Sequence, residues 1–326
     1  MTTPTPESAA SGTGPVSILD DRMRDLVVPD APLVRLGGGA GWAEGPVWLD
    51  DIGELWFSDI IGNRVLRFAT STGEVTDAVP DVEYSNGHTL DAAGRIVQCS
   101  HGRRQLEIMD RDGSITALTS TAGGLGVRLN SPNDAVVDSA GAIWFTDPAY
   151  GLQSPGEGHP GEMEYGACWV FRYDPATEDT SIVVVDMQRP NGLAFSPDES
   201  LMYIADSAFS GSHGSNHSIR VYEVEGPRLV NGRAFAEIEP GVPDGIRVDA
   251  RGNVWTSQAD GVAVYAPDGV QLGHIAVPET VANLCIGGTG PGPGELTRLY
   301  LTATTSLYAI DVAPGFLGTR SLGEGG

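Results

Sequence analysis

The chain has 326 residues, with 44 Gly, 22 Pro and a formal net charge of -24. This acidic excess argues against nucleic acid or an anionic membrane as a partner, because both need clustered cations. All 19 basic residues are Arg, which excludes mechanisms that use a Lys base or a Lys Schiff base.

The first 15 residues are rich in Thr, Pro, Ser and Gly and lack the basic start and apolar run of a signal peptide. We predict a disordered tail over residues 1–15 and a single domain over residues 16–326. No apolar run reaches the roughly 18 residues of a membrane span. Cys99, Cys168 and Cys285 are lone cysteines without CxxC spacing, which is typical of a reducing compartment. These patterns predict a cytoplasmic protein without a membrane partner, and none of them indicates an oligomeric state.

Six segments share one pattern: an apolar strand, a tight turn, a second strand and a hairpin rich in Asp and Gly. In chain order they begin at Gly53, Gly94, Gly141, Glu199, Gly252 and Arg298. This is the content of a four-stranded propeller blade, and no segment shows a sustained helical period. The sequence therefore predicts an all-β fold, a six-bladed β-propeller with four-stranded blades around a central tunnel.

Three further segments refine this prediction. Residues 31–39, "APLVRLGGG", belong to no unit, and we expect them to form an outer strand that closes the ring against the last blade. Insertions at residues 149–166 and 207–216 follow the second strand of the third and fourth units. Loops of this kind over one mouth of a rigid scaffold usually determine specificity.

A polar residue precedes the apolar run of every unit. These residues are Glu44, Asn86, Asn133, Asn191, Asp244 and Asn283. In the first five units the run lies eleven or twelve residues further on. A single Asn-Gly or Asp-Gly pair usually marks a turn, but a shared register predicts a shared place in space. We expect the innermost strand of each blade to begin here, with Val136 and Ile246 directed into the core between blades.

Four of these residues, Glu44, Asn133, Asn191 and Asp244, are the predicted ligands of one divalent metal ion. Asn86 and Asn283 are either supporting groups or ordinary turn residues. Carboxylate and amide oxygens without His or Cys are the donors that hard cations prefer. Ca²⁺ is the first expectation, while Mg²⁺, Mn²⁺, Fe²⁺ and Zn²⁺ stay open.

The same residues carry a family resemblance. The motifs are "EGPVW" from Glu44, "RLNSPNDAVV" from Arg128, "WFTDPAYG" from Trp144, "RPNGLAFSPD" from Arg189 and "PDGIRVD" from Pro243. From about Trp42 to Ile310 the chain resembles the sugar-lactonase group of the gluconolactonase and regucalcin (senescence marker protein) family. The resemblance implies a tunnel metal held by a Glu, two Asn and an Asp, which match the four residues named above. It also implies a small-molecule lactone as the substrate.

Hydrolysis of a lactone needs a polarised carbonyl, a deprotonated water and stabilisation of the oxyanion. Asp134 and Asp244 are the candidate bases. The residues expected to bind substrate are Asn130, His101, Arg103 and Tyr150, with Tyr165 as a lid over the tunnel. Two alternatives stay open. The same site could act on a phosphotriester or on the ring of a specialised metabolite, or the propeller could be a non-catalytic binding platform.

Overall fold

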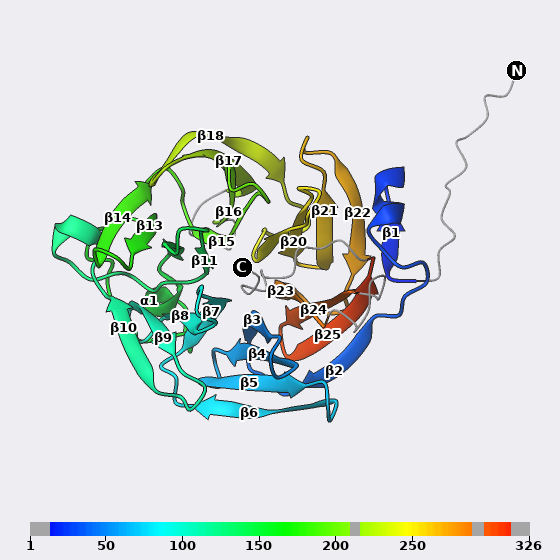
Figure 1. Ribbon diagram of the computed structural model, residues 1–326, viewed down its shortest axis with the longest axis horizontal. Helices are drawn as coiled ribbons and strands as arrows, with labels where there is room; N and C mark the ends of the chain where they lie inside the picture. The colour runs from blue at the N-terminus through cyan, green and yellow to red at the C-terminus, as the bar shows by residue number, and fades with distance from the viewer. Residues whose placement is uncertain (1–13, 209–215, 289–296, 314–326) are drawn as a thin grey trace, which may run out of the picture.

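The computed structural model describes residues 14–208, 216–288 and 297–313, and within them six antiparallel sheets surround a central axis (Figure 1). The innermost strands are β3 (Ala43–Leu49), β7 (Ser85–Leu90), β11 (Ala135–Val137), β15 (Pro190–Phe195), β19 (Ile246–Val248) and β23 (Val281–Gly287). The second strands are β4 (Glu54–Asp59), β8 (Ile96–Ser100), β12 (Ile143–Asp147), β16 (Leu201–Ser207), β20 (Val254–Gln258) and β24 (Thr297–Ala303). The six-bladed propeller is confirmed.

Two more strands complete each blade. The third strands are β5 (Arg64–Ala69), β9 (Gln105–Met109), β13 (Trp169–Asp174), β17 (His217–Glu225), β21 (Gly261–Tyr265) and β25 (Ser306–Val312). The outer strands are β6 (Glu74–Pro80), β10 (Ile115–Thr119), β14 (Asp179–Val184), β18 (Arg228–Glu237), β22 (Gln271–Ala276) and β2 (Val34–Gly38). The short helices are η1 (Asp21–Asp25), η2 (Gly123–Leu125) and α1 (Tyr150–Gln153), the last within the insertion of the third blade.

The start of the described chain closes the ring. β2 pairs antiparallel with β25, as residues 31–39 predicted, and so the last blade takes its outer strand from the N-terminal region. β1 (Val16–Ile18) pairs with β22 and gives the fifth blade an additional strand that the sequence did not predict. Residues 1–13 of the expected tail, and residues 209–215 of the second insertion, lie outside the described residues.

The core lies between neighbouring blades, because each strand directs alternate side chains toward the two adjacent sheets. Trp48 of the first blade stacks on Tyr300 of the last, with ring centroids 5.6 Å apart. Ile246 is fully buried between the fourth and fifth blades, as expected. Val136 is half-buried, packs against the cluster between the third and fourth blades, and also borders a cavity in the tunnel.

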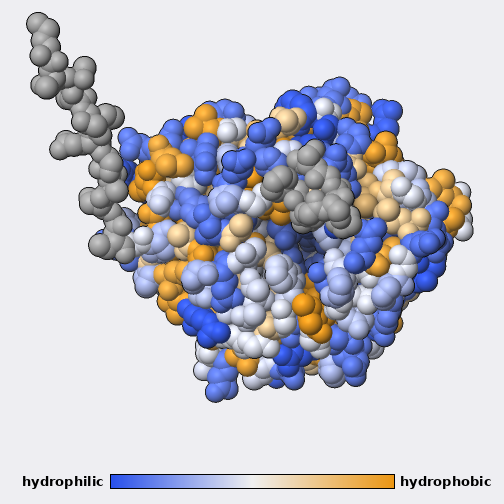
Figure 2. Space-filling view, turned by 180° about the vertical axis from the view of Figure 1, so that it is seen from behind, coloured by the Kyte–Doolittle hydropathy of each residue, from blue (hydrophilic) through white to orange (hydrophobic). Residues whose placement is uncertain are grey.

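The innermost strands form a closed circle, in which β3, β7, β11, β15, β19 and β23 each contact the next and β23 contacts β3. The face opposite that of Figure 1 is mostly hydrophilic, and its hydrophobic residues form small separate groups (Figure 2). Of the helices in the described part of the chain, none is both long enough and apolar enough to cross a membrane.

Candidate active site

The six polar residues lie on one ring around the tunnel because each lies at or just before the start of an innermost strand, and four of these strands are irregular there. The pairing of the first strand with the second is interrupted between Glu44 and Val47, between Ser85 and His88, and between Pro190 and Leu193. A similar interruption separates Val281 from Asn283. Bulges of this kind bend a strand and redirect its side chains.

Close approach of the blades at this ring requires glycine. Gly192 follows Asn191 and donates its backbone N–H to the backbone carbonyl oxygen of Asp244, 3.0 Å away. A Cβ at Gly192 would lie 2.1 Å from that oxygen. A glycine follows the polar residue in four of the six blades. The sixth blade has Leu284 at this position and the third has Asp134, so that a carboxylate lies where four of the blades have no side chain.

Three aspartates at the ends of second strands fix the backbone that leads to the predicted ligands. Each accepts hydrogen bonds from the amides two and three residues before a ligand, at 2.7 to 3.3 Å. The sets are Asp59 with Gly41 and Trp42, Asp147 with Asn130 and Ser131, and Asp206 with Gln188 and Arg189. Sequence reasoning missed them, although each follows its ligand by fourteen or fifteen residues.

Glu44 and Asp244 form an acidic pair at the ring, in which Glu44 is buried and Asp244 half-buried. Glu44 is 4% exposed, and burial raises its pKa to about 8. Burial also raises the pKa of Asp244 well above its usual range, and the nearby charges of Glu44 and Asp134 add to the effect. Within the described residues neither carboxylate forms an ion pair. A positive charge between them would remove this penalty.

Asp134 lies beside this pair and is 2% exposed. Its Oδ1 accepts the backbone N–H of Ala135 at 2.9 Å, whereas its Oδ2 is buried without a hydrogen bond in the described structure. Burial raises the pKa of Asp134, and the guanidinium of Arg247 partly offsets that rise. The structure therefore brings both candidate bases, Asp134 and Asp244, to the same place.

The ring amides differ in what they already bind. The side chain of Asn133 makes no hydrogen bond to the described residues, and Asn191 makes one long contact, 3.5 Å from Nδ2 to the hydroxyl of Tyr150. Asn283 is committed, because its Oδ1 accepts the N–H of Leu284 and its Nδ2 donates to Glu44. These contacts leave the Asn133 amide without a protein partner in the described structure and bind Asn283 to Glu44.

His101 links the ring to the insertion of the third blade. Its Nε2 lies 3.1 Å from Nδ2 of Asn86, and its Nδ1 lies 2.9 Å from the backbone oxygen of Glu157. Burial lowers the pKa of His101 to about 4, so the ring is neutral at pH 7. A proton on Nδ1 satisfies both contacts, because Nε2 then accepts from the amide of Asn86. With both nitrogens bound to protein, His101 positions Asn86.

Glu157 is a functional candidate that the sequence did not reveal. It is half-buried in the insertion, and its carboxylate is near enough to raise the pKa of both Glu44 and Asp244. Burial raises its own pKa, and Arg189 partly offsets that rise. No repeat or motif marks Glu157, because an acidic residue in a Gly- and Pro-rich loop is ordinary. Its position makes it a candidate for contact with substrate.

Tyr150 and Arg189 form a second part of the same mouth. Tyr150 begins α1, and the guanidinium carbon of Arg189 lies 4.7 Å from the centre of its ring. Arg189 also donates to Gln153 at the end of α1. A stacked guanidinium of this kind fixes the aromatic ring and holds the helix against the fourth blade. The Tyr150 hydroxyl is directed toward Asn191. Tyr150, which the sequence predicted to contact substrate, therefore lies beside a predicted metal ligand.

Three predicted substrate residues do not lie at the ring. Asn130 is fully buried, and its amide donates to the hydroxyl of Tyr165 at 2.7 Å. Tyr165 in turn donates to Asp147 at 2.6 Å and stacks on Trp169. Arg103 binds the backbone of Val82 and the carboxylate of Glu107. These contacts hold the three side chains, which lie in turns and bends next to the strands, within the blades, so Asn130 and Tyr165 support the backbone and Tyr165 is no lid.

The donor set at the ring suits a hard metal ion. Among the described residues no cluster of three or more His, Cys, Asp or Glu side chains could hold a metal. The predicted set does not need one, because it combines two carboxylates with the amides of Asn133 and Asn191. The acidic pair without an ion-pair partner in the described structure and the uncommitted amide of Asn133 are the features that fit a bound cation.

Comparison with known proteins places this geometry in a family. The model of the SMP-30/Gluconolactonase/LRE-like region matches residues 42–305. A gluconolactonase of Zymomonas mobilis is 30% identical over 306 residues, which are 86% of this chain and 83% of that protein. An L-arabinolactonase of Azospirillum brasilense is 30% identical and covers 80% of each chain. The structure of a gluconolactonase from Xanthomonas campestris superposes with a TM-score of 0.83 at 35% identity, covering 91% of this chain and 94% of that one. The chain belongs to the SMP-30/Gluconolactonase/LRE-like family.

Proposed function

We propose that this protein is a metal-dependent hydrolase that opens a sugar lactone, with Glu44, Asn133, Asn191 and Asp244 as the metal ligands. The observation that carries the proposal is the acidic pair of buried Glu44 and half-buried Asp244, which has no basic partner in the described structure. Family membership supports the reaction, since the named relatives are a gluconolactonase and an L-arabinolactonase. The protein is an enzyme, and its substrate is a small lactone.

Ca²⁺ is the metal that the donor oxygens favour, because it accepts carboxylate, amide and water oxygens in irregular geometry. Held by these residues, such an ion would polarise the lactone carbonyl and lower the pKa of a water molecule. The protein supplies the charge of Glu44 and Asp244, and the aspartates Asp59, Asp147 and Asp206 hold the backbone of three ligand segments in place.

Asp134 accepts the proton of the attacking water. The Oδ2 of Asp134 has no hydrogen bond in the described structure and lies beside the acidic pair. Of Glu44, Asp134 and Asp244, only Asp134 is not a proposed metal ligand. The water oxygen bonds to the carbonyl carbon, the bond from that carbon to the ring oxygen breaks, and the proton passes to the ring oxygen. The product is a hydroxy acid. Tyr150 and Glu157 provide hydrogen-bonding groups for sugar hydroxyls at the mouth.

The test is acid release measured in a pH-stat with a panel of five- and six-membered lactones. Metal-stripped protein is assayed first and then with added Ca²⁺, Mn²⁺, Fe²⁺, Zn²⁺ or Mg²⁺. We expect no turnover without metal, and loss of about 100-fold or more in kcat for Asp134→Asn with metal affinity retained. Asp244→Asn is expected to lose metal binding as well, measured by calorimetry.

Asp198→Asn is the matched control, because Asp198 is an acid that binds Ser196 and Ser200 in a turn between strands of the fourth blade. Its kinetics should equal those of the wild type. Full turnover by metal-stripped protein would refute metal dependence. Unchanged kcat in Asp134→Asn would refute its role as proton acceptor and leave the lactonase proposal intact.

A further inference from the structure

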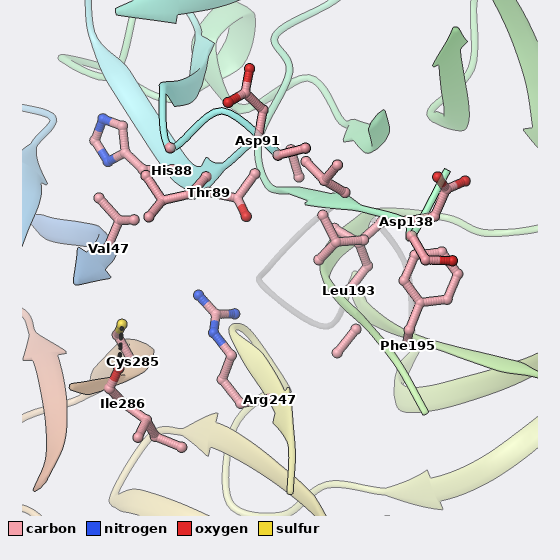
Figure 3. A pocket seen from close by; sticks show the side chains of 18 of the residues that line it. Val47, His88, Thr89, Asp91, Asp138, Leu193, Phe195, Arg247, Cys285 and Ile286 are labelled. Atoms are coloured by element: carbon pink, nitrogen blue, oxygen red, sulfur yellow. Dashed lines mark hydrogen bonds between the residues drawn. The ribbon is translucent and has the colours of Figure 1, made fainter. Parts of the chain in front are cut away.

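A cavity of about 670 Å³ opens at the end of the tunnel opposite the polar ring. The later residues of the innermost strands form its walls, and the turns that follow those strands form its rim (Figure 3). Small-molecule sites in proteins commonly have volumes of about 300 to 1,000 Å³. The cavity has this size, and none of the residues assigned to the lactonase reaction lines it.

Arg247 of β19 extends into the middle of this cavity (Figure 3). Its Nη1 donates to the backbone oxygen of Ile246 at 2.7 Å. Within the described residues no carboxylate forms an ion pair with it, although most arginines there have one. Asp134, above the cavity, is near enough to feel its charge but is not in contact. The remaining N–H groups of this half-buried guanidinium therefore face the cavity.

The acids at the rim already have donors of their own. Asp51 forms two 2.7 Å bonds with Arg111, and Asp91 lies 2.7 Å from Arg95. Asp138 accepts the indole N–H of Trp144 at 2.9 Å as well as backbone amides of its turn. These contacts hold the three rim carboxylates in place, and among the described residues Arg247 is a cation of the cavity wall without an ion-pair partner.

The walls around Arg247 are mainly apolar. Val47 lies on one side of it, and Leu193 and Phe195 lie on the other (Figure 3). His88 also borders the cavity, but its ring nitrogens bind Ser85 and the backbone oxygen of Gly45. A guanidinium enclosed by aliphatic and aromatic walls fits a ligand with one planar anionic group and an apolar body.

We propose that this cavity binds a small organic carboxylate, with its carboxylate on Arg247 and its hydrocarbon part against Val47, Leu193 and Phe195. Arg247 can donate two parallel hydrogen bonds to a carboxylate. A phosphate or chloride ion could also accept hydrogen bonds from Arg247, but it would leave the apolar part of the cavity unfilled. The site is separate from the polar ring, and the inference does not depend on the lactonase reaction.

The probe is hexanoate, titrated by isothermal calorimetry into protein kept in a metal chelator, so that carboxylate binding to a metal ion is excluded. We expect a Kd of about 1 mM or below, as for a ligand of this size with one charged contact. Hexanamide, of the same shape without the charge, should bind at least about tenfold more weakly, as should acetate and inorganic phosphate.

Arg247→Gln should abolish hexanoate binding, whereas Arg111→Gln should retain it, because Arg111 lines the same cavity but is paired with Asp51. Thermal unfolding of each variant checks that it is folded. If Arg247→Gln does not fold, the preference of the wild type for hexanoate over hexanamide decides the matter. Absence of hexanoate binding at about 10 mM, equal binding of hexanamide or phosphate, or unchanged binding in folded Arg247→Gln would each overturn the proposal.

Discussion

Replacing Glu44 by Gln should stabilise the metal-free protein while destroying its activity. Glu44 has a pKa of about 8 in the folded protein against 4.5 for an ordinary Glu. A carboxyl group whose pKa is higher in the folded state binds its proton more tightly there. Its contribution to stability is therefore complete below pH 4.5 and is lost as the pH rises toward 8.

The size of the effect follows from the pKa difference. Each pH unit between the ordinary pKa of 4.5 and pH 7 lowers the stability of the folded state by about 1.4 kcal/mol. The total cost of ionising Glu44 at pH 7 is therefore roughly 3 kcal/mol. Part of that cost is shared with Asp244, because the charge of Glu44 raises the pKa of Asp244. We expect Glu44→Gln to gain about 2 kcal/mol at pH 7, or roughly 3 °C in Tm for a chain of this length.

The measurement is thermal unfolding in a chelator at several values between pH 4.5 and 8, for wild type, Glu44→Gln and the exposed control Glu74→Gln. The advantage of Glu44→Gln should be near zero at pH 4.5 and should grow with pH. Added Ca²⁺ should reverse the order by stabilising the wild type more. A pH-independent difference, or equal stabilisation by Ca²⁺ in both proteins, would contradict the assignment of this pair as a cation site.

Three further predictions concern the structure around the ring. Gly192→Ala should lose about 1 to 3 kcal/mol of stability from its clash with the next blade, while Gly124→Ala, with no atom within 4 Å of its added Cβ, should be neutral in the same melts. Asp206→Asn should weaken Ca²⁺ binding by about tenfold in calorimetry, and Asp198→Asn should not. Burial lowers the pKa of His88 to about 4, so the unfolded chain binds more protons between pH 6.5 and 4. The free energy of unfolding should therefore fall by about 3 kcal/mol as the pH is lowered from 6.5 to 4, and His88→Gln should remove this contribution.

The blades were predictable because hydrophobic alternation and turn residues repeat six times. Residues 31–39 belong to none of these repeats, and so they could be assigned as the strand that closes the ring. The ring was predictable for the same reason, since Glu44, Asn133, Asn191 and Asp244 share one register. The pattern could not reveal β1, whose three residues are too few to show a period.

The edges of the site depended on information that the sequence pattern lacks. Asn130 belongs to the same motif as Asn133, yet its amide turns to Tyr165 inside the blade. Glu157 reaches the ring because an irregular loop returns over it, and no periodicity governs that path. Motif membership thus identified a strand end, whereas side-chain direction came from three-dimensional packing.

The closure of the last blade by β2 has a consequence for biosynthesis. The Nε of Arg35 binds the hydroxyl of Ser306, 3.0 Å away and 271 residues later in the chain. A ribosome releases Arg35 long before its partner exists, so the first blades assemble beside an unpaired strand that waits for the C-terminal segment. Truncation before β25 would leave that strand without its partner, as an aggregation-prone edge.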